Sequence, residues 1–175
     1  KSHKNLDDQQ TLLTEMFSPH ANSDAALTDK GEALVQAMID KKMLIDIAHL
    51  DTAAANEVVG IAARNQNYPI FNSHTYLHET VTEDEKKHTK HIDINLVRAI
   101  KRSGGVVGLR TGPDEQVAYL PGRVANTCHG SSRSFAQGYA LATMGEGVSV
   151  AFGTDMNGMI ESTGPRFASG DDSCS

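Results

Sequence analysis

The sequence predicts an α/β fold built on parallel strands, and three observations lead to that prediction. Four short apolar runs alternate with segments of helical periodicity, which is the order of parallel strands joined by helical crossovers. The runs end in His49, His74, Arg110 and Asp155, and barrel enzymes keep their chemistry at the carboxyl ends of strands. The motifs G-x-G-x-x-G and G-x-x-x-x-G-K-[ST] of nucleotide-binding open sheets are absent from the sequence. We therefore expect a partial (β/α) barrel of the TIM type, with about four parallel strands and flanking helices.

The first helix is predicted over residues 29–42, and the first strand follows directly. Asp29 can cap the helix while Glu32 reaches back to the same end. The apolar positions recur at helical spacing and are Leu34, Val35, Met38 and Ile39. The mostly apolar run 43–49 is typical of a strand buried on both faces, and it ends on a histidine.

The second unit repeats this order. Asp51 or Thr52 can cap a helix rich in alanine and valine. Residues 69–74 form the next predicted strand, which also ends on a histidine. We expect the polar stretch 75–91 that follows to be a solvated, mobile surface loop.

Two further units complete the predicted sheet. Asp93 can cap a third helix that leads to a strand over residues 105–110. A loop with prolines and glycines precedes a fourth helix from about Ser131 to Met144. The run 148–155 then closes the series on a carboxylate.

The composition limits the classes of function. With 175 residues, 39% hydrophobic and 22% charged, we expect residues 1–175 to be a single partial-barrel domain that lacks the N-terminal half of the barrel. The net charge of -6 and the scattered basic residues argue against a nucleic-acid partner and favour small or neutral ligands. No apolar tract is long enough for a transmembrane segment.

The two cysteines, Cys128 and Cys174, lie in stretches rich in Gly, Ser and Asp. Two free thiols or one disulfide bridge fit that setting. No targeting segment opens the chain, so the localisation stays open. A bridge would favour a secreted or periplasmic location, and free thiols a cytoplasmic one.

His49 and His74 stand at equivalent positions in successive βα units. Neutral imidazole is the commonest metal ligand, and two of them at the ends of neighbouring parallel strands would stand close enough to share one ion. This pattern favours a zinc site. The alternative is that each is a loop histidine that faces water, as we expect for most of the other histidines.

Asp155 is preceded by Gly153 and followed by Gly158, which let the backbone turn sharply and bring the carboxylate over the mouth of the barrel. A carboxylate beside a metal-activated water can accept a proton and deliver it to a leaving amine. An aspartate that only caps the following turn fits the sequence equally well.

Five strings, taken in order, resemble the successive signatures of the renal (membrane) dipeptidase family. They read LTDKG at 27–31, MLIDIAH at 43–49, NSHT at 72–75, SGGVVG at 103–108 and GTDMNG at 153–158. Each string alone is weak, but their order and spacing together are specific and cover most of the chain.

The resemblance implies a zinc-dependent barrel of the amidohydrolase type with a binuclear site. By this analogy His49 and His74 hold one of the two ions, and Asp155 handles the proton of the bridging water. His3 matches a histidine that the family uses to steady the substrate carbonyl oxygen as charge develops on it.

The sequence departs from the family at two places. The H-x-D of the first strand and the glutamate that bridges both ions belong, by the resemblance, before Lys1. Where dipeptidases carry an arginine for the substrate carboxylate, this chain has Lys90, which does not form the planar two-pronged pair that arginine makes. Lys90 and Arg110 are the candidate substrate-binding residues, and a free dipeptide is less favoured as substrate.

The leading functional hypothesis is a zinc-dependent hydrolase of peptide or related amide bonds. The departure at Lys90 leaves room for an amidase or lactonase on the same scaffold. A catalytically silent half-barrel that serves as a binding or assembly module is the third reading, since the upstream ligands are not in this chain.

Four strands taken from a closed barrel leave two unpaired edge strands. Their apolar side chains also lack the strands that would pack against them from the opposite wall of the barrel. The residues expected to be left without that wall are Ile45, Phe71, Val107 and Val150. We therefore expect a homo-oligomer or an association with the missing half of the barrel.

Overall fold

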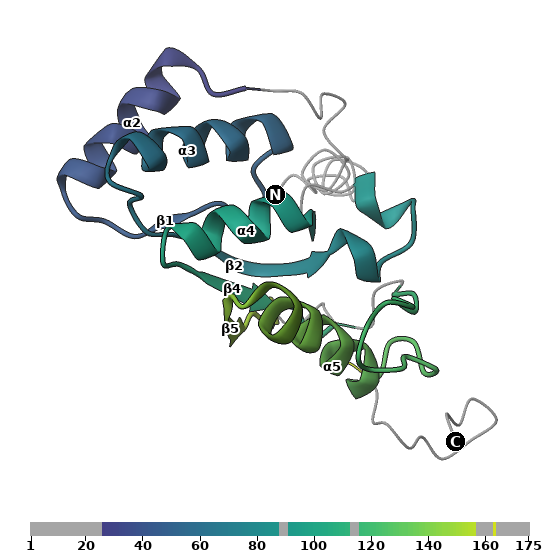
Figure 1. Cartoon of the computed structure of the whole chain (residues 1–175). Coiled ribbons are helices and arrows are strands. Elements are labelled where there is room, and N and C mark those ends of the chain that lie inside the picture. Colours follow the sequence, from purple (N-terminus) through teal and green to yellow (C-terminus); the bar gives the residue numbers. More distant parts are fainter. Residues whose placement is uncertain (1–25, 88–90, 113–115, 157–162, 164–175) are drawn as a thin grey trace, which may run out of the picture.

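Strands and helices alternate along the chain, and each main strand pairs with the main strand that follows it in sequence (Figure 1). The structure is a computed structural model that describes residues 26–87, 91–112, 116–156 and 163. The sheet order is β1-β2-β4-β5, with the short β3 paired to the end of β2, and all these pairings are parallel. The predicted α/β class is confirmed.

The strands are β1 (Ile45–Asp46), β2 (Ile70–Leu77), β3 (His91–Ile92), β4 (Val106–Leu109) and β5 (Ser149–Phe152). The α-helices are α2 (Asp29–Asp40), α3 (Thr52–Arg64), α4 (Ile94–Arg102) and α5 (Ser132–Ala140). The turns η1 (His78–Thr80) and η2 (Glu85–Lys87) are 3₁₀-helical, and α5 continues into a π-helical segment, η3 (Leu141–Glu146). None of the helices in the described part of the chain combines the length and the hydropathy needed to cross a bilayer.

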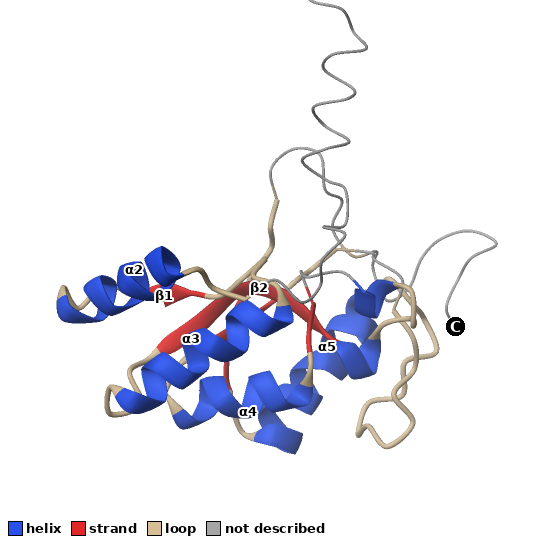
Figure 2. Ribbon diagram, turned by 90° about the horizontal axis from the view of Figure 1, so that it is seen from above, coloured by secondary structure: helices blue, strands red, loops and turns tan. Residues whose placement is uncertain are grey.

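The helices cover one face of the sheet. Successive helices contact one another, α2 with α3, α3 with α4, and α4 with η3, so the chain winds in a single direction (Figure 2). A doubly wound sheet would carry helices on both faces and would reverse its strand order. Sequential parallel strands with helices on one side are the arrangement of a portion of a (β/α) barrel, as the sequence predicts.

Short polar side chains fix where the helices begin. The Asp93 carboxylate accepts a hydrogen bond from the backbone N–H of Leu96 at 2.8 Å, as predicted for the start of α4. The cap of α2 is Thr28, whose hydroxyl accepts from Gly31 N–H, and the prediction of Asp29 as the cap is wrong. Asp29 lies one residue inside the helix, where its charge still favours the positive end of the helix dipole.

Three of the four side chains that were expected to lack an opposite wall pack against the helices, and only Phe71 lies on the other face of the sheet. Ile45 and Val107 are 2% and 0% exposed because they pack against the helices, and Val150, which pairs with Val107, also packs against this core. The apolar side chains of the other face include the half-buried Phe71 and Val106, and Leu44, directly before β1, is 77% exposed. A strand alternates with a period of two, so an error of one residue exchanges the faces.

The stretch 75–91 is not the solvated loop that its charge predicts. Residues 75–77 continue β2, where Tyr76 and Leu77 pair with β3. The His91 side chain is 0% exposed, and its Nε2 lies 2.7 Å from a carboxylate oxygen of Glu85. A buried histidine is tolerated where a carboxylate pairs with it, so part of this charged stretch belongs to the fold.

Candidate active site

The four predicted site residues of the described chain lie at one edge of the sheet. His49 follows β1, Arg110 follows β4 directly, and Asp155 follows β5. His74 lies inside β2, which runs on to Leu77, so the prediction that this strand ends on His74 is wrong. The carboxyl ends of parallel strands meet at the same edge, and this brings the side chains together.

The two histidine rings converge. The Nε2 atoms of His49 and His74 lie 2.7 Å apart, and the ring centroids lie 4.7 Å apart with a tilt of 57° between the planes. Partial desolvation of the His49 ring, and then the neighbouring His74, lower the pKa of His49 below its ordinary value. His49 is therefore neutral at neutral pH, which is the state in which imidazole binds a metal.

Polar neighbours orient the His74 ring and the loop after β1. Ser73 Oγ lies 2.8 Å from His74 Nδ1, and a His74 Nδ1–H that donates to Ser73 leaves the Nε2 lone pair pointing at His49. The Asp46 carboxylate accepts from the N–H groups of both Ala48 and Ser73 at 3.0 Å and so joins the end of β1 to β2. Asp46 and Ser73 were not predicted as site residues, although both are polar residues inside strand-like runs.

We expect Ser73→Ala to weaken zinc binding by about tenfold, because loss of a side chain that orients a metal-ligating histidine costs about 10- to 100-fold in affinity. Chelator competition measures the zinc affinity of the variant. Ser149→Ala is the matched control, since Ser149 is an exposed serine at the start of β5. An unchanged zinc affinity in Ser73→Ala would contradict the orienting role.

Asp155 lies between a histidine and an arginine. One carboxylate oxygen, Oδ1, lies 3.8 Å from His74 Nε2, and the other, Oδ2, lies 3.3 Å from Arg110 Nη2. The Arg110 side chain is 4% exposed, and its guanidinium lies over the Tyr76 ring at 5.4 Å from the centroid. Tyr76 is fixed in turn because its hydroxyl donates to Gly112 O at 2.7 Å. Buried aromatic packing thus holds Arg110 against the Asp155 carboxylate.

The backbone is left-handed at two of the four site residues, with φ of 62° at His49 and 52° at Asp155. Such a conformation in a residue other than glycine costs of the order of 1–3 kcal/mol and persists where the surrounding structure enforces it. Strain of this kind clusters at functional sites, and both residues here point into the same cluster.

A β-bulge redirects the β2 backbone at His74. Between the paired positions Asn72↔Val107 and Thr75↔Leu109, β2 has one residue more than β4. An extra residue of this kind bends the strand and re-aims its side chains. The bulged segment packs tightly, because a Cβ at Gly108 or at Gly153 would overlap the carbonyl oxygen of Ser73.

We expect Gly108→Ala to lower the free energy of unfolding by roughly 1–3 kcal/mol, since the added methyl group meets backbone atoms that cannot move aside. Denaturant titration measures this change. Gly60→Ala is the control, because Gly60 lies inside α3 with only the flexible end of Arg64 near its Cβ position. The control should be neutral or stabilising, by up to about 1 kcal/mol. A Gly108→Ala protein as stable as the wild type would refute the close approach.

The described residues supply part of a metal site. Imidazole nitrogens are ligands of the kind that zinc takes, and those of His49 and His74 lie within hydrogen-bond distance of each other. No group of three or more His, Cys, Asp and Glu side chains in the described part of the chain is arranged to hold an ion. His3 and Lys90, the predicted carbonyl-stabilising and carboxylate-binding residues, lie outside the described residues. The ligand roles of His49 and His74 stay predictions.

The fold is similar to that of solved metallopeptidases. A metallo peptidase from Rhodobacter sphaeroides, liganded with a phosphinate mimic of the dipeptide L-Ala-D-Ala, matches with a TM-score of 0.59 at 20% identity, over 82% of this chain and 37% of that chain. The probable dipeptidase PvdM from Pseudomonas aeruginosa matches with a TM-score of 0.62 at 17% identity, over 84% and 46%. The dipeptidase AC, a metallo peptidase of family M19, matches with a TM-score of 0.57 at 18% identity, over 82% and 38%.

At these low identities the three structural matches show a common fold and no more. The chain spans less than half the length of each of these three structures. No curated protein matches the sequence. The family model of the membrane dipeptidases, peptidase family M19, matches residues 9–162 and so includes every predicted site residue except His3. The chain therefore belongs to the membrane dipeptidase family.

Proposed function

We propose that this chain forms part of a zinc-dependent hydrolase of peptide or related amide bonds, with a binuclear site in the complete barrel. The observation that carries the proposal is the approach of His49 Nε2 and His74 Nε2 to 2.7 Å at the carboxyl edge of two adjacent parallel strands, with Asp155 beside them. Family membership supports the same class of reaction.

His49 and His74 would hold one zinc ion through their Nε2 atoms. Bound zinc lowers the pKa of water and polarises the carbonyl group that is attacked. The Asp155 carboxylate, 3.8 Å from His74 Nε2, would accept the proton of the attacking water and return it to the leaving amine. His3 remains the candidate that stabilises the negative charge on the carbonyl oxygen.

Arg110 has two candidate roles. Arg110 was predicted from the sequence to bind the substrate, but its side chain is buried and its guanidinium already faces Asp155. The ion pair keeps the Asp155 carboxylate oriented beside His74, so we infer that Arg110 acts mainly as a positioning residue. Recognition of a substrate carboxylate then falls to Lys90, which attracts a carboxylate as a point charge.

Hydrolysis of a free dipeptide, compared with the same dipeptide amidated at its C-terminus, tests the proposal on the whole protein with its zinc content measured in parallel. Dependence on zinc with a preference for the free carboxylate supports a dipeptidase. Zinc-dependent hydrolysis without that preference would favour the amidase reading, which the lysine at position 90 motivates. A protein without zinc and without hydrolysis would overturn the proposal.

The face of the sheet opposite the helices carries apolar side chains that are not fully buried. Phe71 and Val106 are only half-buried there, and Leu44, directly before β1, is 77% exposed. We propose that a second set of strands packs on this face, from a second copy of the chain or from the rest of the barrel. Molar mass in solution tests this point: a stable 18.8 kDa monomer would contradict it.

A further inference from the structure

A carboxylate ends the pairing between β1 and β2, which lie side by side in the sheet (Figure 2). A backbone hydrogen bond from Ile47 N–H to Phe71 O at 2.9 Å extends this pairing one residue past β1. In a continued parallel ladder the Ile47 carbonyl would next accept from Ser73 N–H. Here Ser73 N–H donates to Asp46 Oδ1 at 3.0 Å. The Asp46 side chain thus takes the place of a backbone acceptor at the carboxyl edge of the sheet.

The carbonyl that this exchange leaves available closes a turn over residues 47–50. The first carbonyl of the turn accepts from its last N–H at 3.3 Å, and His49 occupies the third position. A turn of type II requires a left-handed backbone at that position, and the φ of His49 is 62°. The same Asp46 oxygen also accepts from Ala48 N–H, inside the turn, at 3.0 Å. Asp46 therefore fixes the backbone that directs the His49 ring.

The backbone of Ser73 is held from two sides. Asp46 accepts from its N–H, and its carbonyl oxygen lies so close to Gly108 and Gly153 that a Cβ at either glycine would overlap it. This residue belongs to the bulge of β2 and directly precedes His74. A backbone held in this way leaves the His74 ring little freedom to turn away from His49.

We propose that Asp46 is a positioning residue of the candidate site. Its Oδ1 atom joins the turn that carries His49 to the bulge that carries His74, and so brings the two Nε2 atoms to 2.7 Å. The inference rests on the proposed function, in which these nitrogens hold one zinc ion, because ligands that are already in place bind without a further ordering cost.

The Asp46 side chain can be removed without opening the core. It is exposed on the face of the sheet opposite the helices, since the neighbouring Ile45 packs against the helices and a strand alternates between its faces. Its loss leaves no buried cavity, so we expect variants at this position to fold.

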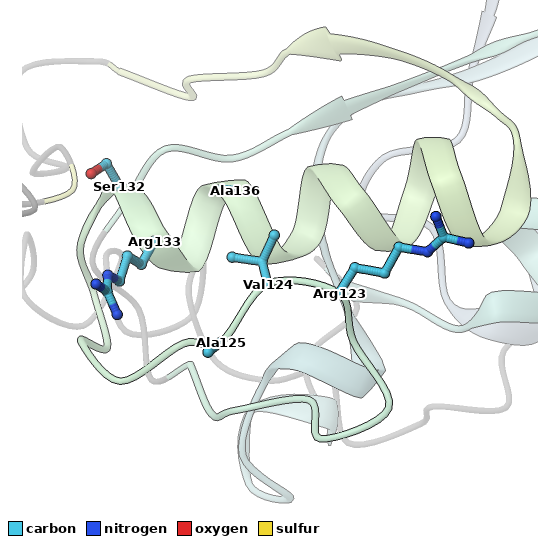
Figure 3. Close-up of a pocket in the computed structure, with 6 residues that line it drawn as sticks. All are labelled: Arg123, Val124, Ala125, Ser132, Arg133 and Ala136. Carbon is cyan, nitrogen blue, oxygen red and sulfur yellow. The ribbon is translucent and has the colours of Figure 1, made fainter.

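A cavity beside α5 offers a control that is separate from the site. It measures about 490 Å³ and is lined by residues 123–125, Ser132, Arg133 and Ala136, and none of these is a predicted site residue. Figure 3 shows the Arg123 and Arg133 side chains pointing away from each other along α5. Arg133 donates to the hydroxyl of Thr127, the neighbour of the disulfide-bonded Cys128, at 2.6 Å. Arg133→Ala therefore removes a polar contact without changing the turn or the bulge.

The Asp46→Ala variant removes the acceptor that the turn and the bulge share. In the whole protein after removal of zinc, NMR should show a nuclear Overhauser contact between the His49 and His74 rings, and this variant should lose it. Its zinc affinity, measured by chelator competition, should fall by about 10- to 100-fold, as for other groups that orient a metal-ligating histidine. Asp46→Asn keeps an acceptor oxygen in place, so it should retain the ring contact and lose less zinc affinity.

Two controls should keep both the ring contact and the zinc affinity. One is Arg133→Ala, and the other is Asp40→Ala, which removes an exposed carboxylate that accepts from Gln36 Nε2 at 3.0 Å on α2. Circular dichroism shows whether each variant is folded. If Asp46→Ala does not fold, Asp46→Glu supplies the test, because one more methylene group moves the carboxylate away from both N–H groups and the ring contact should again be lost.

A folded Asp46→Ala protein that keeps the ring contact would overturn the inference. Equal losses in Asp46→Asn and Asp46→Ala would also overturn it, since the acceptor oxygen would then not be the cause. Loss of the ring contact in Asp46→Ala supports the inference even if the wild-type protein binds no zinc, a result that would contradict the proposed function alone.

Discussion

We expect His74→Ala to lower the zinc affinity of the protein by more than about 100-fold, because loss of a mere partner of a metal-ligating histidine costs about 10- to 100-fold. His49→Ala should have an effect of the same order, since the two Nε2 atoms converge on one point. In the double variant the losses should not add, because either change alone leaves an incomplete ligand set. Competition with a chromophoric chelator measures all three affinities.

His129→Ala is the control for this series. His129 is exposed and belongs to the loop before α5, so its loss should leave zinc binding unchanged. Circular dichroism separates loss of the ligand from loss of the fold. A folded His74→Ala protein that keeps wild-type zinc affinity would remove the metal site from this edge of the sheet.

Local signals made the helices predictable. Asp93 and Ser131 cap α4 and α5 through hydrogen bonds to N–H groups two or three residues ahead, so the information lies within a few residues of sequence. The π-helical end of α5 was not predictable in this way. It depends on how the helix end packs against β5 and α4, and no short sequence pattern records those contacts.

The edge on which the site lies was predictable because parallel strands end together. His49, His74 and Asp155 were assigned to that edge from their positions alone, and the structure brings all three within one cluster. Their exact placement was not predictable. A bulge adds one residue to β2 beside His74, and strand alternation in the sequence cannot show where such a residue is inserted.

The buried histidine of β3 shows where charge misleads. His91 follows a run of acidic and basic residues that is typical of a solvated loop, and the prediction treated it as one. Its partner Glu85 lies in the same run, and burial depends on the pair and on the packing of the Tyr76 ring against His91 at 5.4 Å. A contact that stabilises two polar residues only together cannot be inferred from either residue alone.

We expect Asp155→Asn to lower kcat for dipeptide hydrolysis by about 10²–10⁴-fold, the usual contribution of a general acid–base residue, while zinc content stays at the wild-type level. Asparagine has the shape of aspartate and tolerates the left-handed backbone with φ of 52° at this position. The change therefore removes the proton acceptor without adding backbone strain. Steady-state kinetics and metal analysis on the same preparation check both halves of the prediction.

The Arg110→Met variant tests whether Arg110 positions the Asp155 carboxylate or binds the substrate carboxylate. Methionine keeps the apolar contact with the Tyr76 ring but loses the 3.3 Å ion pair with Asp155, so kcat should fall less than in Asp155→Asn. If Arg110 instead bound the substrate carboxylate, KM would rise for a free dipeptide and stay constant for its amide. Asp40→Asn is the control for Asp155→Asn, because it removes one negative charge from an exposed aspartate at the end of α2. Wild-type turnover by Asp155→Asn would exclude this carboxylate as the base, since the proton transfer would then proceed without it.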